Sequence, residues 1–239
     1  MKKTLTYLFS LLLISSLVFL YSFSSSKNLN KKIIKIEVEF EEGTNDFLTH
    51  KMVNKLLIQK NKSVQNQAKS VIDLQGLEYV VLSNPYIEKA TVYYTIDGVL
   101  RTIVKQRTPI ARVNAFNTSY YVDKQGVRVP LSTNYSARVI LVTGAILEGD
   151  LKQITKYVNV ILADDFLKKE IIGIHKKENN EYVLNVRSGS YKVEFGNLDE
   201  VKTKFSKLKA FYNSVSEDKT LEKYKTINLK YHNQVVCAK

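Results

Sequence analysis

The side chains that could carry catalysis or bind a metal are few and scattered. Three histidines, His50, His175 and His232, lie far apart and lack the spacing of a metal site or a catalytic triad. The two carboxylates Asp164 and Asp165 are adjacent, and adjacent residues of a helix point about 100° apart. Helix capping is therefore a better interpretation than paired acid–base catalysis. The sequence predicts no enzyme activity and no cofactor.

Cysteine content and charge narrow the function further. A single cysteine, Cys237, excludes an intrachain disulfide and a thiolate metal cluster, and we expect it to be a small, half-buried apolar residue. The formal net charge is +13, carried mostly by lysines spread along the whole chain. Nucleic-acid readers cluster their basic residues and favour arginine. The distribution instead favours a basic surface near anionic headgroups or an acidic partner.

A long apolar run opens the chain. The 23 residues of range 4–26 carry no charge, and as a helix they would extend about 34 Å, enough to cross a hydrocarbon core of about 30 Å. A cleaved signal peptide is the alternative, since Lys2 and Lys3 precede the run and small serines follow it. The run is longer than a typical signal core, and Tyr21 and Phe23 resemble interfacial anchors. We prefer a retained span, with a cytoplasmic tail at 1–3 and the rest of the chain outside.

The segment that follows the span has the order β-α-α-β-β. Alternation predicts a half-buried strand over 33–40, and helical spacing predicts a helix over 47–60. Asp73 could cap a second helix that ends before Pro85. Two alternating strands then flank a hairpin, for which we expect a three-residue loop, Asp97–Val99.

The second segment contains more strand. We expect strands over 119–122, 127–131 and 139–142, a helix over 149–164, and a meander of strands over 171–175, 182–186 and 191–195. Asn197 and Glu200 fit a capping box for a long helix. The range 226–236 reads as a strand pair or one long bent strand. The expected fold class is α+β: a transmembrane helix, a β-α-α-β-β domain, and a second β-rich mixed domain.

Motifs in a fixed order carry a family resemblance. The first segment exits through Gln106-Arg107-Thr108-Pro109-Ile110-Ala111. Further along stand Tyr121-Val122-Asp123 with Gly126, then Leu141 with Thr143-Gly144, then Phe195-Gly196-Asn197, and finally the range 227–236, INLKYHNQVV. In this order they resemble the FtsQ/DivIB family of bacterial cell-division proteins, whose first domain is a polypeptide-transport-associated (POTRA) module. Three residues depart from the family pattern, Gln106 for Glu, Asn228 for Asp and Lys230 for Arg.

The resemblance implies a noncatalytic scaffold of the divisome at the division septum. It implies a single-pass protein of the bacterial cytoplasmic membrane with a POTRA-like domain at 33–107 and a β-rich domain at 108–239. The implied partners are FtsB/DivIC-like and FtsL-like single-span proteins, bound outside the membrane to link early and late septum-assembly proteins. Other division proteins could bind the POTRA-like domain. A POTRA-bearing protein of export or outer-membrane assembly is the alternative, but it would need a β-barrel or repeated POTRA units.

The family's partner adds a strand at the terminal strand region. The match carries this role to Thr226, Ile227, Asn228, Leu229, Lys230, Tyr231, Asn233, Gln234 and Val235. The residues allow it independently, because a terminal strand with no later strand to cover it tends to be an edge, and edges recruit extended partners. Tyr231 could anchor a partner or could face the core. Lys230 could meet an acidic partner or could be a solvated edge residue.

Overall fold

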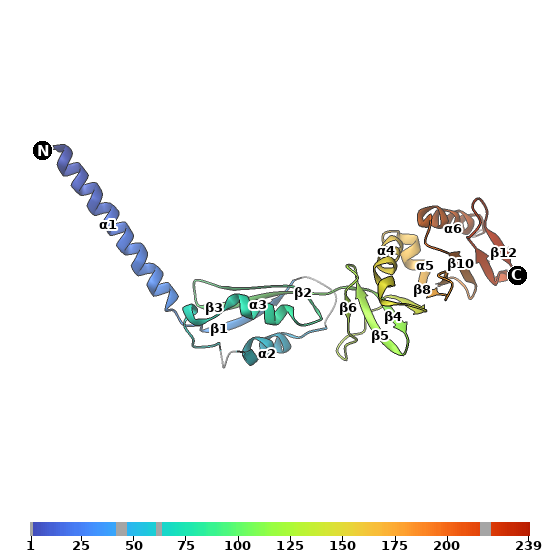
Figure 1. Cartoon of the computed structure of the whole chain (residues 1–239), viewed down its shortest axis with the longest axis horizontal. Coiled ribbons are helices and arrows are strands. Elements are labelled where there is room, and N and C mark those ends of the chain that lie inside the picture. Colours follow the sequence, from blue (N-terminus) through green and yellow to red (C-terminus); the bar gives the residue numbers. More distant parts are fainter. Residues whose placement is uncertain (1, 42–46, 61–63, 216–220) are drawn as a thin grey trace. The chain divides into compact units, whose positions relative to one another are not determined.

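The protein divides into two compact units. The computed structural model describes residues 2–41, 47–60, 64–215 and 221–239. Unit 1 spans Met1–Gln106 and unit 2 spans Arg107–Lys239. The change from one unit to the next falls inside the exit motif, between Gln106 and Arg107. Figure 1 shows the elements of each unit along the chain.

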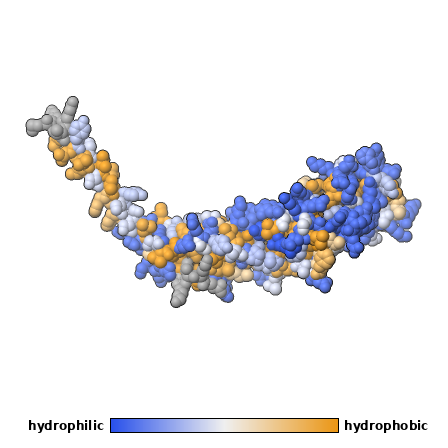
Figure 2. Space-filling view, in the orientation of Figure 1, coloured by the Kyte–Doolittle hydropathy of each residue, from blue (hydrophilic) through white to orange (hydrophobic). Residues whose placement is uncertain are grey.

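The apolar run forms one continuous helix, α1, over Lys2–Leu29. Its portion Leu5–Leu29 is long and apolar enough to cross a membrane, and none of its apolar window is buried inside the protein. Figure 2 shows apolar residues along this helix. An uncovered helix of this length and composition needs an apolar surrounding. Of the predicted tail at 1–3, Met1 lies outside the described residues.

Unit 1 has the predicted β-α-α-β-β order. After α1 its elements are β1 (Lys35–Phe40), α2 (His50–Lys60), the 3₁₀ turn η1 (Lys69–Val71), α3 (Leu74–Leu82), β2 (Ile87–Tyr94) and β3 (Val99–Gln106). The strands form one sheet in the order β1-β3-β2, with β1 parallel and β2 antiparallel to β3. Asp73 caps α3 as predicted, because its Oδ1 accepts a hydrogen bond from the Gly76 amide at 2.9 Å.

Two local predictions in unit 1 are wrong, the hairpin loop by one residue and the start of the first strand by two. The hairpin pairs Tyr94 with Leu100, and Thr95 N donates to Val99 O, so the loop is 96–98. Gly98 takes the left-handed φ of +87° that closes a three-residue loop, whereas the predicted loop would place the β-branched Val99 there. In the strand predicted over 33–40, Ile33 is fully buried and Ile34 is 68% exposed, because β1 begins only at Lys35.

Unit 2 is built on one mixed sheet. Its strands are β4 (Pro109–Ala115), β5 (Thr118–Asp123), β6 (Arg128–Val129), β7 (Ile140–Gly144), β8 (Ile171–Lys176), β9 (Tyr182–Val186), β10 (Lys192–Gly196), β11 (Thr226–Asn228) and β12 (Val236–Ala238). Its helices are η2 (Glu148–Asp150), α4 (Leu151–Leu162), α5 (Asp165–Glu170), α6 (Val201–Val215) and η4 (Leu221–Lys223). Among the described residues the sheet order is β12-β11-β10-β9-β8-β7-β4-β5-β6.

The core of unit 2 lies between the sheet and its helices. The amphipathic helices α4 and α6 bury one stripe each, and an aromatic cluster joins them, with Tyr157 of α4 stacked on Phe205 of α6 at 5.7 Å between ring centroids. Phe195 of β10 lies 5.0 Å from Phe205. Stacked and tilted aromatic pairs of this kind stabilise a core beyond their buried area. The predicted α+β class is confirmed.

Two features of unit 2 differ from expectation. The central strand β4 was not expected, because Pro109 begins it and its buried residues do not alternate. The capping box is wrong: α6 begins at Val201, and the side chain of Asn197 binds Asp199 and Lys204 instead. Of the two alternatives for 226–236, the strand pair is confirmed: β11 and β12 are two short antiparallel strands joined by a loop.

Candidate protein-binding surface

The expected open edge is one strand further out than predicted. β11 pairs in parallel with β10 on one side and antiparallel with β12 on the other. It therefore has no free side for an added strand, and the expectation that it forms the edge is wrong. In the described part of the sheet, β12 is the terminal strand. We call β11, the loop 229–235 and β12 together the C-terminal edge.

The predicted partner-binding residues of this edge separate into a buried group and an exposed group. Ile227 and Leu229 are fully buried in the core of unit 2, so they cannot contact a partner. Tyr231 is 49% exposed, which rules out the alternative that it faces the core. Lys230, Asn233 and Gln234 are also exposed, while Thr226, Asn228 and Val235 are half-buried.

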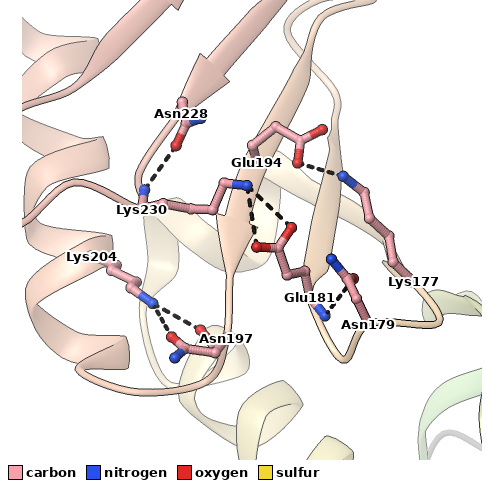
Figure 3. A network of polar contacts seen from close by, with 8 residues as sticks. All are labelled: Lys177, Asn179, Glu181, Glu194, Asn197, Lys204, Asn228 and Lys230. Carbon is pink, nitrogen blue, oxygen red and sulfur yellow. Dashed lines mark hydrogen bonds and ion pairs between the residues drawn. The ribbon is translucent and has the colours of Figure 1, made fainter.

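Lys230 crosses the sheet to reach an acidic residue (Figure 3). Its Nζ donates to both carboxylate oxygens of Glu181, at 3.1 and 3.2 Å, and its backbone amide donates to Asn228 Oδ1 at 2.9 Å. The stem passes over Gly196, where an added Cβ would lie 2.7 Å from Lys230 Cγ. The hydrogen bond from Lys230 is the main cause that lowers the pKa of Glu181. Lys230 is thus an exposed residue that is already ion-paired within the chain.

Two neighbouring contacts extend this network (Figure 3). Lys177 Nζ binds Glu194 of β10 at 2.7 Å. Lys204 of α6 donates to both the backbone and the side-chain oxygen of Asn197, each at 2.8 Å. Burial lowers the pKa of Lys204. Three lysines, Lys230, Lys177 and Lys204, therefore make charged contacts around the ends of β9 and β10.

The loop 229–235 is held from the helix side by Lys207. Its Nζ, on α6, donates to the carbonyl oxygens of Leu229 (3.1 Å), Tyr231 (2.5 Å) and His232 (3.2 Å). Backbone carbonyls in a short loop have no ladder partner, so a lysine that satisfies three of them fixes the loop. This contact fixes the backbone of Tyr231 in the loop between β11 and β12.

The exit motif forms two separate attachments. Gln106 closes unit 1, with Oε1 accepting from Leu48 N at 3.0 Å. Arg107 begins unit 2, with Nη1 donating to Asp123 Oδ2 at 2.7 Å. Asp123 is buried, and its Oδ1 also accepts hydrogen bonds from two backbone amides of its own turn, those of Gln125 and Val127. Pro109 and Ala111 lie in β4, where Ala111 is buried between β5 and β7. The motif is therefore structural in both units.

The histidine, aspartate and cysteine side chains that could carry chemistry instead make structural contacts. His50 packs edge-on against Phe40, and His175 Nδ1 lies 3.0 Å from Thr143 Oγ1. Asp164 caps α5 as predicted, through the amides of Phe166 and Leu167. Burial raises the pKa of the half-buried Cys237 thiol, which keeps it protonated. No group of three or more His, Cys, Asp or Glu side chains suited to a metal occurs among the described residues.

Sequence reasoning missed two parts of this surface. Lys207 was one lysine among many in an amphipathic helix, and only the fold brings it to the loop. The strand β12 spans three residues with no alternation long enough to read. The glycine at position 196 was the sequence signal for the crossing of Lys230. In the structure Gly196 has a left-handed φ of +76°, and the Lys230 side chain of the same chain passes over it at the end of β10.

The fold defines a class of protein: one apolar helix, a small β-α-α-β-β unit, and a larger mixed-sheet unit with an open terminal strand. The apolar helix fits a single-pass membrane protein. Residues 32–105 match the POTRA-like domain, and residues 108–238, more than half of the chain, match the family described as FtsQ/DivIB, C-terminal related. The chain belongs to the FtsQ/DivIB family of cell-division proteins.

Comparison with solved structures gives a match of low similarity. The major extracytoplasmic domain of the trans isomer of the bacterial cell division protein DivIB from Geobacillus stearothermophilus is 16% identical, with a TM-score of 0.35. The match covers 47% of this chain and 97% of that structure. No curated protein matches the chain.

Proposed function

We propose that this chain is a noncatalytic scaffold of the divisome. In this proposal α1 anchors it in the bacterial cytoplasmic membrane, and both units lie outside the cytoplasm at the division septum. Membership of the FtsQ/DivIB family supports the cell-division role. The scaffold would bind FtsB/DivIC-like and FtsL-like single-span partners and so link early and late septum-assembly proteins.

The observation that carries the binding proposal is the open side of β12. A terminal strand offers unpaired backbone N–H and C=O groups, and an extended partner segment can add to them as a further strand. Tyr231, exposed in the loop that leads into this strand and held through its carbonyl oxygen by Lys207, would supply the aromatic anchor. The partner would therefore contact β12 and the loop 229–235, not β11.

Neighbouring proline substitutions test the use of the edge. Successive amides of a strand point to opposite sides, so of Val236→Pro and Cys237→Pro one removes a bond to β11 and the other removes an outward N–H. Thermal unfolding identifies the outward position as the one that keeps stability. We expect that variant to lose binding to the extracytoplasmic segment of an FtsB/DivIC-like partner in a biosensor assay. Full binding by the stable variant would contradict strand addition.

The anchor is tested by Tyr231→Ala. Loss of a hot-spot tyrosine costs about 2 kcal/mol or more, which corresponds to a roughly 30-fold weaker Kd. Tyr79→Ala is the matched control, because Tyr79 is an exposed tyrosine of unit 1. Equal affinity of the two variants would remove Tyr231 from the interface.

A further inference from the structure

The tip of the β2–β3 hairpin lies beside the end of the membrane helix. Ile96, the first residue of the hairpin loop, is 81% exposed, which makes it the most exposed of the large apolar side chains described. It lines a hollow of about 800 Å³ together with Tyr21, Phe23 and Lys27 of α1 and with Lys31 just beyond it. An isoleucine exposed to this extent next to an apolar helix indicates a contact with a further apolar surface.

Two lysines hold the tip at this place. Lys69, only 9% exposed, donates from Nζ to Thr95 O at 2.8 Å and to Asn28 Oδ1 at 3.3 Å. Lys31 Nζ donates to Ile96 O at 3.2 Å. The first contact joins the end of α1 to the last residue before the loop, and the second joins the linker to the loop itself. Both α1 and the hairpin belong to unit 1.

The position of Ile96 along α1 sets its depth in a bilayer. A hydrocarbon core of about 30 Å takes about 20 helical residues, so a span that begins at Leu5 leaves the core near Ser24. Tyr21 and Phe23 then lie at the interface, where aromatic side chains are enriched. Ile96 lines the same hollow as these two aromatic residues, and its carbonyl oxygen accepts a hydrogen bond from Lys31, so the tip lies between the interfacial level of the aromatic side chains and the level of Lys31.

The charges around the tip fit a lipid surface. Lys27 and Lys31 lie at the level of the headgroups, where each basic residue is attracted by anionic lipid. Asp97, the acidic neighbour of Ile96 in the loop, is exposed and disfavours deep insertion. The combination of one apolar tip, flanking lysines and one acid is typical of shallow contact with the interface, not of a second span.

We propose that Ile96 inserts into the bilayer interface as a second, non-spanning anchor, with Lys27 and Lys31 against anionic headgroups. With α1 as its one anchor, unit 1 could rotate in the membrane about the axis of that helix. Two contacts with the membrane, tied together through Lys69 and Lys31, fix which side of the unit faces the bilayer. The ligand at this site is the anionic lipid surface itself.

Site-specific fluorescence tests the contact in the full chain. A Cys237→Ala background leaves no other thiol, and Ile96→Cys carries an environment-sensitive dye. The control is Leu82→Cys: Leu82 is also apolar and 41% exposed, but it is the last residue of α3 and precedes the start of the eight-residue strand β2, whose far end, roughly 25 Å away, leads into the tip. The proteins are placed in nanodiscs of phosphatidylcholine with phosphatidylglycerol, with or without a nitroxide on the upper acyl chain.

We expect nitroxide lipids to quench the dye at residue 96 and to leave residue 82 unchanged. Quenching at residue 96 should weaken when phosphatidylglycerol is omitted, since the lysines then lose their anionic headgroups. Equal quenching at both positions, or none at residue 96, would overturn the proposal. A dye at residue 96 that responds only to an added FtsB/DivIC-like or FtsL-like partner, and not to nitroxide, would assign the tip to a protein instead.

Discussion

The ion pair at the start of unit 2 allows a sharp stability prediction. Asp123 Oδ2 accepts from Arg107 at 2.7 Å, while Oδ1 accepts from Gln125 N and Val127 N at 2.9 Å each. The side chain of Asp123 is 3% exposed and that of Arg107 is 17% exposed. The substitution Asp123→Asn keeps Oδ1 and its two backbone bonds. It places an amide NH₂ group against the guanidinium, so that two donors face each other.

The magnitude follows from the burial of the pair. A hydrogen bond between charged groups contributes about 1.5–3 kcal/mol, and breaking a buried ion pair costs about 3–5 kcal/mol. Arg107 keeps some access to water, so we expect Asp123→Asn to lower the free energy of unfolding of unit 2 by about 3 kcal/mol. Much of this loss comes from the guanidinium that is left unpaired. It should therefore shrink to about 1 kcal/mol when Arg107→Met is already present.

Urea unfolding of residues 32–239, followed by circular dichroism, measures both values. Asp97→Asn is the control, since it changes an exposed loop carboxylate of unit 1 and should alter stability by less than about 0.5 kcal/mol. The reasoning fails if Asp123→Asn lies within that range of the wild type. It also fails if the same loss appears in the Arg107→Met background, because the cost would then not come from the pair.

Three further outcomes follow from single contacts. Gly196→Ala should lower the free energy of unfolding by about 1–3 kcal/mol, because φ is +76° and the new Cβ meets the stem of Lys230. Thermal or urea unfolding measures this loss, and a variant as stable as the wild type would contradict the close approach. Asp164→Ala should remove about 1 kcal/mol by loss of the cap of α5. The pKa of Asp164 is lowered in the folded state, chiefly by its bond from a lysine, so its contribution is present above about pH 4 and is lost as the pH falls below its folded pKa. A pH titration of stability should show a shallower acid limb for the variant, and an unchanged limb would contradict the assignment. Lys207→Met should speed amide exchange in 229–232 without global unfolding, whereas unchanged exchange would show that the loop is held by other contacts.

Long periodic elements were predictable from the sequence, and the C-terminal edge was not. The helices α3 and α6 and the meander β8–β10 follow from alternation, helical spacing and turn residues. The partners of β11 depend on pairings between distant segments, which local patterns do not encode. The sequence of 226–236 allowed a strand pair or one long bent strand, and it could not decide between them or show that β12 folds back on β11. The order of motifs along the chain was enough to indicate the family. Which strand ends the sheet could be seen only in the structure.

The resemblance pointed to the C-terminal segment as the partner site, which stays a prediction, and in the described sheet the terminal strand of that segment is β12, not β11. Lys230 stands where the family has arginine, and it reaches Glu181 within the same chain. A lysine makes this contact as a point charge, without the bidentate fork of arginine. Its pairing within the sheet means that an acidic partner would have to compete with Glu181, which favours the exposed Tyr231 and β12 as the contact.

The two fully buried residues of the C-terminal edge have a consequence for export. The core of unit 2 begins with β4 at Pro109 but is closed by Ile227 and Leu229, about 120 residues later. A chain that is exported in N-to-C order after α1 can complete unit 1 early, yet unit 2 stays open until its last strands, β11 and β12, have emerged. The surface that we propose for partners therefore does not exist on a half-translocated chain. In this proposal a chain stalled in export would not compete with finished chains for partners, so partner binding would wait for the completion of transport.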